Sequence, residues 1–158
     1  MKIEELLVIE EIRALKAKYC YYIDLKDWDG YAGLFTRDAS LVTDTAVSSR
    51  GEDPKSLPAV RGRDAIRQMI SQLLVDAVTV HQCHTPIIEL TSATTATGIW
   101  AMEDVVRMRG YHLHARGHYR ERYVFEDGRW LIESLHLTRT MIDNLEGTFP
   151  PTMPVLKN

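Results

Sequence analysis

The chain has 158 residues, a size typical of one domain, and its 45% hydrophobic and 26% charged fractions exclude a disordered or fibrous protein. A formal net charge of −3 leaves no basic excess for gripping phosphates, so nucleic acid is not an expected partner. No apolar run approaches the roughly 18 residues of a membrane-spanning helix and the charged N-terminus is unlike a signal peptide, so we expect a cytoplasmic protein.

Three helices are predicted in the first half of the chain. Residues 4–26 repeat apolar side chains at spacings of three and four, as a long amphipathic helix does. A short second helix is expected after Asp27, whose side chain can cap it, and an extended stretch begins near Asp38. Residues 63–74 show the helical spacing again. Residues 44–59 are rich in Ser, Gly and Pro and predict a loop, long enough to act as a lid.

Four long β-rich runs follow, at residues 78–90, 95–108, 111–125 and 129–142. Turn-forming residues separate them, among them Asp127-Gly128, a pair favoured in tight hairpins. Helices followed by an antiparallel meander predict an α+β domain, a cone-shaped half-barrel in which a curved antiparallel sheet wraps around N-terminal helices. We expect this domain over residues 1–146 and a C-terminal tail over residues 147–158, where prolines prevent regular structure.

Asp24 and His81 are the first candidates for proton transfer. Asp24 ends the apolar stripe of the first helix, where the helix dipole disfavours a carboxylate. It is therefore either a solvated end residue or held by a specific partner. A neutral imidazole beside a carboxylate transfers protons near neutral pH, which is the functional interpretation of His81. The alternative is a core histidine bonded to a backbone carbonyl.

Metal binding and redox chemistry are not expected. His81 and His84 have HxxH spacing, but strand alternation sends them to opposite faces, so joint zinc ligation needs a bulge. Cys20 and Cys83 lack CxxC spacing and are interpreted as buried thiols without a disulfide. The sequence also lacks a Gly-rich phosphate loop, a Ser nucleophile elbow and an HExxH helix. No metal or organic cofactor is predicted.

Asp104 is the third candidate, because it shares strand parity with Trp100, Met102 and Val106. A carboxylate on an apolar face must be paired or kept neutral, since an isolated buried charge is costly. Arg139 on the last run can supply the pairing. A purely structural ion pair and a catalytic role are therefore both open for Asp104.

Taken in order along the chain, these residues resemble the SnoaL-like family. The matching pieces are Lys18-Tyr19 with Asp24, His81-x-x-His84-Thr85-Pro86, residues 95–104, residues 119–123, and Asp127-Gly128-x-Trp130 with Arg139. The likeness covers residues 9–142 and within the family is closest to the bile-acid 7α-dehydratase group. Scytalone dehydratase and hexachlorocyclohexane dehydrochlorinase are more distant. The loop at 44–59, the stretch at 107–118 and the tail depart from the bile-acid enzyme.

The resemblance implies a small-molecule lyase, a dehydratase, or a related isomerase. It places His81 on the family's catalytic histidine and Asp24 on the carboxylate that orients it. Tyr19 and Asp104 fall on further active-site positions, and Arg139 on a nearby basic one.

The substrate implied is a hydrophobic cyclic hydroxy-carbonyl compound, such as a steroid, polyketide, aromatic or terpenoid. Trp100, Met102 and Tyr119 are expected to line its apolar pocket, with His84 close by. The same fold also serves non-catalytic ligand carriers and oxygenase small subunits, so a binding or assembly module is the alternative. An acid and a base facing one cavity favour an enzyme.

Self-association is also expected. A half-open sheet exposes one broad face, which we expect to carry Tyr111, Leu113 and Val124. An apolar sheet face that no helix covers usually finds a partner chain, so a homo-oligomer is predicted, a dimer or trimer by resemblance.

Overall fold

The structure is a computed structural model that describes residues 2–47 and 56–147. Its described elements, in chain order, are α1 (Ile3–Leu25), α2 (Trp28–Ala32), β1 (Phe35–Thr43), β2 (Val60–Arg61), α3 (Arg63–Leu74), β3 (Val78–Cys83), β4 (Ile87–Leu90), β5 (Thr95–Met108), β6 (Tyr111–Glu126) and β7 (Arg129–Glu146). The centre of the predicted 44–59 loop and nearly all of the predicted tail lie outside the described residues.

The helices form where the apolar periodicity places them. α1 ends at Lys26, whose left-handed φ of 63° turns the chain away. Asp27 then caps α2, because its side chain accepts a hydrogen bond from the Gly30 N–H at 2.9 Å. α3 buries Ile66, Ile70 and Leu74 on one face, as the three-and-four spacing predicts.

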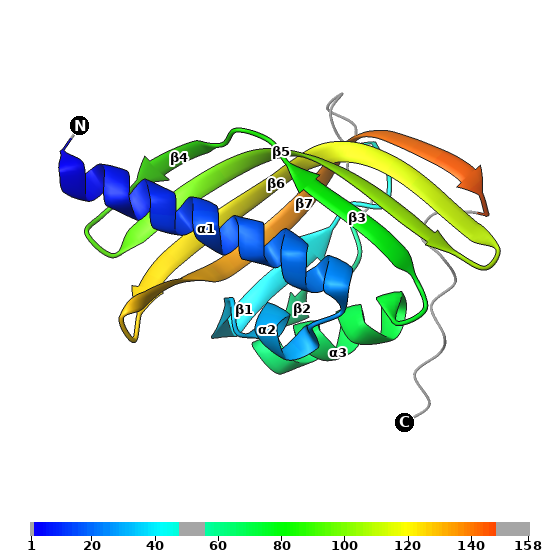
Figure 1. The fold of residues 1–158 in the computed structure, drawn as a ribbon, viewed down its shortest axis with the longest axis horizontal. Coiled ribbons are helices and arrows are strands. Elements are labelled where there is room, and N and C mark those ends of the chain that lie inside the picture. The colour runs from blue at the N-terminus through cyan, green and yellow to red at the C-terminus, as the bar shows by residue number, and fades with distance from the viewer. Residues whose placement is uncertain (1, 48–55, 148–158) are drawn as a thin grey trace.

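The strands form one curved sheet in the order β2-β1-β7-β6-β5-β3, with β4 also paired to β5. The long strands β5, β6 and β7 make the expected antiparallel meander. The expectation of an all-antiparallel sheet is wrong at one place, because β1 pairs with β7 in parallel. The edge strands β2 and β3 do not pair with each other, so the sheet stays open (Figure 1).

The first predicted β-rich run is divided into two strands. β3 pairs with the second half of β5, from Met102 to Arg107, and β4 pairs with its first half, from Ala96 to Ile99. Pro86 lies between the two strands and has no N–H to give to a ladder. The break separates His81, within β3, from His84, which follows it.

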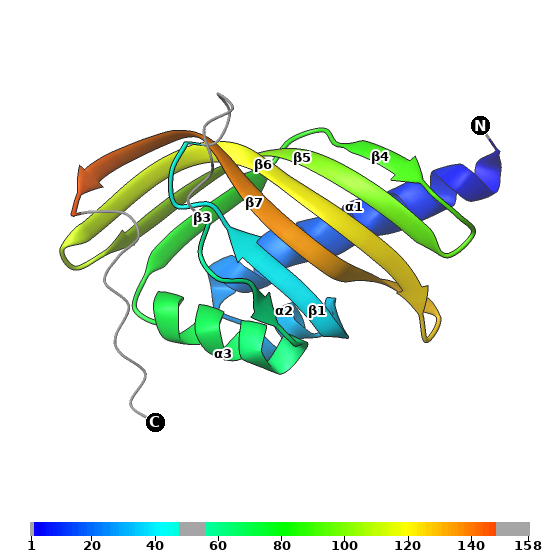
Figure 2. The same ribbon diagram turned by 180° about the vertical axis from the view of Figure 1, so that it is seen from behind.

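One face of the sheet is covered by α1, which crosses it diagonally, while α2 and α3 gather near β1 and β2 (Figures 1 and 2). Alternate residues of β5 and β6 point to this covered face, and the core lies there. Tyr111 and Leu113 belong to it, with 5% and 1% of their surface exposed, so placing them on the outer face was wrong. They share β6 parity with Tyr119, whereas Val124 has the opposite parity.

β7 carries a bulge at Thr140, next to Arg139 and opposite Gly117 of β6. The register shifts between Arg116 and Gly117, and Gly117 pairs with Arg139. A Cβ at Gly117 would lie 1.9 Å from the Thr138 carbonyl oxygen, so a residue without a side chain is required. No helix in the described part of the chain is long and apolar enough to cross a membrane.

Candidate functional site

Asp24 and His81 meet where the last turn of α1 packs on β3. His81 Nδ1 lies 2.7 Å from Asp24 Oδ1, and the His81 backbone N–H donates to Asp24 Oδ2 at 2.9 Å. Thr79, two residues earlier on the same side of β3, donates its hydroxyl to Asp24 Oδ1 at 2.8 Å. Three donors from one strand therefore hold this carboxylate at the helix end that the dipole disfavours.

These contacts keep Asp24 ionised. Burial raises the pKa of Asp24, but the hydrogen bonds from the His81 ring, the His81 backbone and Thr79 outweigh it, so the pKa lies below its usual value. An ionised carboxylate only accepts, so His81 Nδ1 carries the proton of their hydrogen bond. In the neutral ring Nε2 is then unprotonated, which is the form of a general base.

The His81 side chain is 7% exposed and lines a cavity of about 110 Å³ between the sheet and the helices. Most of the lining is apolar and comes from α1, α3 and the inner faces of β1, β5, β6 and β7. Its polar and aromatic lining residues are Tyr19, Thr43, His81, Asp104, Tyr111, Tyr119 and Arg139. Asp24 is not a lining residue and contacts the cavity only through His81.

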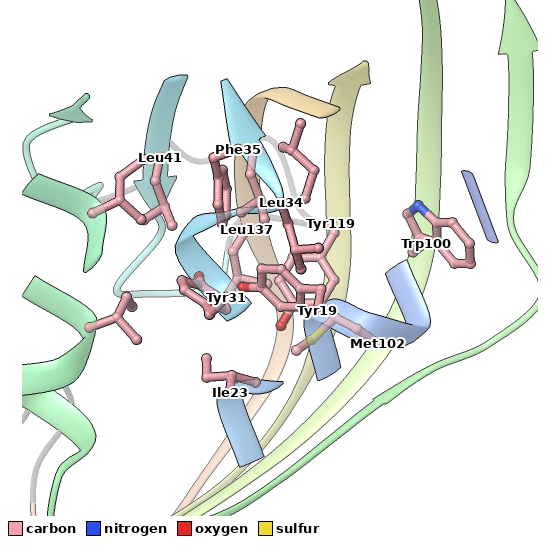
Figure 3. Packing of buried hydrophobic residues seen from close by; sticks show 14 of the residues in the cluster. Tyr19, Ile23, Tyr31, Leu34, Phe35, Leu41, Trp100, Met102, Tyr119 and Leu137 are labelled. Carbon is pink, nitrogen blue, oxygen red and sulfur yellow. The ribbon is translucent and has the colours of Figure 1, made fainter. Parts of the chain in front are cut away.

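Tyr19 and Tyr119 form the aromatic wall of the cavity. Their ring centroids are 5.5 Å apart, and Tyr31 packs 5.1 Å from Tyr19 on the other side (Figure 3). Burial raises the pKa of Tyr19, and the neighbouring Tyr119 adds to the effect. Tyr19 therefore keeps its hydroxyl proton at neutral pH and can donate a hydrogen bond.

Asp104 and Arg139 form a bidentate ion pair in the cavity wall. Arg139 Nη1 and Nη2 donate to the two Asp104 oxygens at 2.7 and 3.1 Å, and both side chains are almost fully buried. Of the two states expected for Asp104, paired or neutral, the structure has the paired one. This geometry stabilises the carboxylate and leaves Asp104 as an acceptor.

Three residues predicted for the substrate pocket lie elsewhere. Trp100 and Met102 are buried on the inner sheet face but are not among the cavity-lining residues, and Figure 3 shows Trp100 apart from the tyrosines. Trp100 instead donates its indole N–H to the Tyr123 hydroxyl at 2.7 Å. His84 lies with Trp100 in a separate open cleft, into which His81 also reaches. Strand parity predicts which face of the sheet a side chain lies on, but it does not predict whether that part of the strand borders the cavity.

No group of three or more metal-ligating side chains occurs in residues 2–47 and 56–147. His81 is half-buried and His84 is exposed, and both border the same open cleft. His81 Nδ1 is also committed to Asp24. The residues present thus offer His81 to proton transfer and no shared site to a zinc ion.

Sequence reasoning missed a buried charged pair beneath the tyrosine wall. Lys16 of α1 and Glu121 of β6 form an ion pair whose side chains are 1% and 0% exposed. The Lys16 ammonium lies 3.7 Å from the Tyr19 ring centroid and 3.5 Å from that of Tyr119. The sequence does indicate that both residues are buried, because Lys16 falls on the apolar stripe of the helix and Glu121 has the strand parity of Tyr119.

The chain was compared with known proteins. A protein of unknown function from Mycobacterium tuberculosis is 26% identical over 86% of this chain and 73% of its own, with a TM-score of 0.71. A scytalone dehydratase-like protein from Novosphingobium aromaticivorans is 20% identical, with a TM-score of 0.75 over 100% and 99% of the two chains.

A type 2 hexachlorocyclohexane dehydrochlorinase is 19% identical, with a TM-score of 0.74 over 95% of this chain and 97% of its own. Likeness at such identity shows a shared fold. Residues 4–136 match the SnoaL-like domain, most of the chain. The chain therefore belongs to the SnoaL-like family.

Proposed function

We propose that this protein is a cofactor-independent lyase, a dehydratase or a related isomerase, that acts on a hydrophobic cyclic hydroxy-carbonyl compound. The observation that carries the proposal is the hydrogen bond between Asp24 and His81 at the edge of an apolar cavity that Tyr19 also lines. The resemblance to the bile-acid 7α-dehydratase group, with its active-site residues at these positions, supports the same chemistry.

The reaction follows from the protonation states. Nε2 of His81 takes the proton α to the substrate carbonyl, and Asp24 stabilises the imidazolium that forms. The electron pair moves to the carbonyl oxygen, and Tyr19 donates a hydrogen bond to this enolate. The enolate then collapses to a double bond, expelling the β-hydroxyl group, which takes the proton back from His81 and leaves as water. The His81 imidazole returns to its starting protonation state, so no cofactor is consumed.

Asp104 is better suited to shaping the cavity than to giving a proton. Both Asp104 oxygens accept hydrogen bonds from Arg139, so an Asp104 that gave a proton to the substrate would first have to lose this pairing. In this proposal His81 alone exchanges protons with the substrate, and the ion pair orients the substrate's polar groups from the cavity wall.

The cavity favours a substrate with a single ring. Its volume is about 110 Å³, while an apolar protein cavity of roughly 150 Å³ holds one benzene molecule. A fused steroid is much larger than this space. Single-ring aromatics and monocyclic terpenoids therefore come first among the classes that the resemblance implies.

The test is a screen of monocyclic β-hydroxy ketones and thioesters for water loss, followed by ultraviolet absorbance of the conjugated alkene. For a substrate found in this way, His81→Ala should lower turnover by about 10² to 10⁴-fold. Asp24→Asn should also lose rate while still binding the ligand, and the double variant should be little worse than His81→Ala, because the two groups act as a unit.

The matched control is His118→Ala. His118 is another strand histidine, at a β6 position facing away from the cavity, so its removal should leave turnover unchanged. If His81→Ala turns over the substrate as fast as wild type does, the acid/base mechanism is wrong. A ligand that binds in the cavity but is never converted would instead favour the non-catalytic binding module.

A further inference from the structure

The two cysteines of the chain lie next to each other in space. Cys20 of α1 and Cys83, the last residue of β3, have their sulfur atoms 3.5 Å apart, although 63 positions separate them in sequence. Both are free thiols and are half-buried, where the sequence suggested buried thiols. A disulfide needs a sulfur separation of about 2.05 Å, so an approach of roughly 1.5 Å is required. The two sulfur atoms lie on elements that already pack together, α1 and β3.

The pair is open to small molecules from solvent. Cys20 and Cys83 line an open cleft on the side of His81 away from the substrate cavity. His84 and Trp100 form other parts of its wall. A small oxidant can therefore reach the sulfur atoms without entering the cavity assigned to the substrate.

The surroundings of the two thiols shift their pKa values in opposite directions. The hydrogen bond with the Cys83 thiol lowers the pKa of Cys20, against the effect of burial, and the Lys16 ammonium lowers it further. The same hydrogen bond and burial raise the pKa of Cys83. The thiolate, which is the nucleophile, therefore forms more readily at Cys20 than at Cys83.

We propose that Cys20 and Cys83 are a redox-active dithiol, which hydrogen peroxide converts into an intramolecular disulfide. The Cys20 thiolate attacks the peroxide, so that an S–O bond forms and the O–O bond breaks, leaving a sulfenic acid and hydroxide, which takes a proton to become water. The Cys83 sulfur then attacks the Cys20 sulfur, the S–S bond forms, and the sulfenic oxygen leaves with the Cys83 proton as a second water. The two thiols together give up two electrons, and these reduce the peroxide.

The bond would fasten together the two elements that hold the site. Cys20 lies one helical turn before Asp24, and Cys83 lies two residues after His81 on the same side of β3. Closing a loop of this length restricts the unfolded chain and stabilises the fold, provided that the native geometry accepts the bond. The proposal needs no catalytic activity, so it stands or fails separately from the proposed function.

The test uses the reduced, purified full chain at low concentration with a few equivalents of hydrogen peroxide. After unfolding and treatment with N-ethylmaleimide, intact mass should show the loss of two hydrogen atoms and no maleimide adduct. The reduced sample should carry two adducts, and dithiothreitol should restore both. The melting temperature of the oxidised form should rise by roughly 4 to 16 °C.

Two single variants serve as controls. Cys83→Ser should stop at the sulfenic acid of Cys20, which dimedone traps, and Cys20→Ser should react with peroxide much more slowly than wild type. Neither should show an oxidation-dependent rise in melting temperature. Recovery of two maleimide adducts after peroxide, disulfides only between chains, or a lower melting temperature on oxidation would each overturn the proposal.

Discussion

Replacing Lys16 by Met removes one charge from the most deeply buried ion pair described in this structure. Met keeps much of the length and the apolar stem of Lys, so the change isolates the ammonium group. Glu121 then remains 0% exposed, and within the described part of the chain the Tyr123 hydroxyl is the donor left to its carboxylate. A buried charge that loses its partner is poorly compensated, since one neutral donor does not replace a cation.

The magnitude follows from this burial. Breaking a buried pair on one side costs about 3–5 kcal/mol of unfolding free energy. In a chain of this size each kcal/mol lowers the melting temperature by about 2–4 °C, so Lys16→Met should melt about 6–20 °C below wild type. Glu121→Gln should lose less unfolding free energy than Lys16→Met. The Lys16 ammonium keeps its place over the Tyr19 and Tyr119 rings, and the Gln amide oxygen can still accept a hydrogen bond from it.

The assay is urea unfolding of wild type, both single variants and the double variant Lys16→Met/Glu121→Met, together with thermal melts. The double variant buries no charge and should recover most of the loss. If the unfolding free energy of Lys16→Met lies within about 1 kcal/mol of the wild-type value, the pair is not buried as described. A double variant as unstable as the sum of the singles would show that the two side chains do not interact.

Three further predictions concern other parts of the molecule. Because the pKa of Asp24 is lowered in the folded state, the unfolded state takes up a proton at Asp24 first as the pH falls below about 4, so acid destabilises wild type there. Between pH 5 and pH 3 the urea midpoint should therefore fall less for Asp24→Asn than for wild type, and an equal fall would contradict the pKa direction. Gly117→Ala places a Cβ against the Thr138 carbonyl and should lower the melting temperature more than Gly98→Ala, which meets the Tyr123 side chain; equal melting temperatures would argue against the bulge. Light scattering at micromolar concentration should give a dimer or trimer mass, and a monomer mass would refute self-association.

The local sequence identifies some features of the candidate site, and the tertiary structure alone provides the others. Asp24 and His81 could be named together only through family resemblance, because neither residue carries a local pattern that points to the other. The donors that make the pair chemically meaningful, Thr79 and the His81 N–H, are ordinary strand groups. Only the packing of α1 on β3 turns them toward the carboxylate.

Local periodicity was sufficient for the long helices and for the inner faces of the long strands. Apolar spacings of three and four determine α1 and α3, and alternation determines that Asp104 shares the inner face of β5 with Trp100 and Met102. These patterns are readable because each residue's direction is set by the backbone of its own helix or strand. The same rule predicts that Tyr111 and Leu113 face inward with Tyr119, once β6 is treated as a single strand.

Long-range contacts were decided by the tertiary structure alone. The parallel pairing of β1 with β7 joins segments about a hundred residues apart, and the Lys16 to Glu121 pair spans 105 positions. The Cys20 to Cys83 contact spans 63. In each case the local pattern says only that a face is buried, and the sheet's curvature across α1 determines which faces meet. The position of the cavity, and hence the exclusion of Trp100 from it, follows from that same curvature.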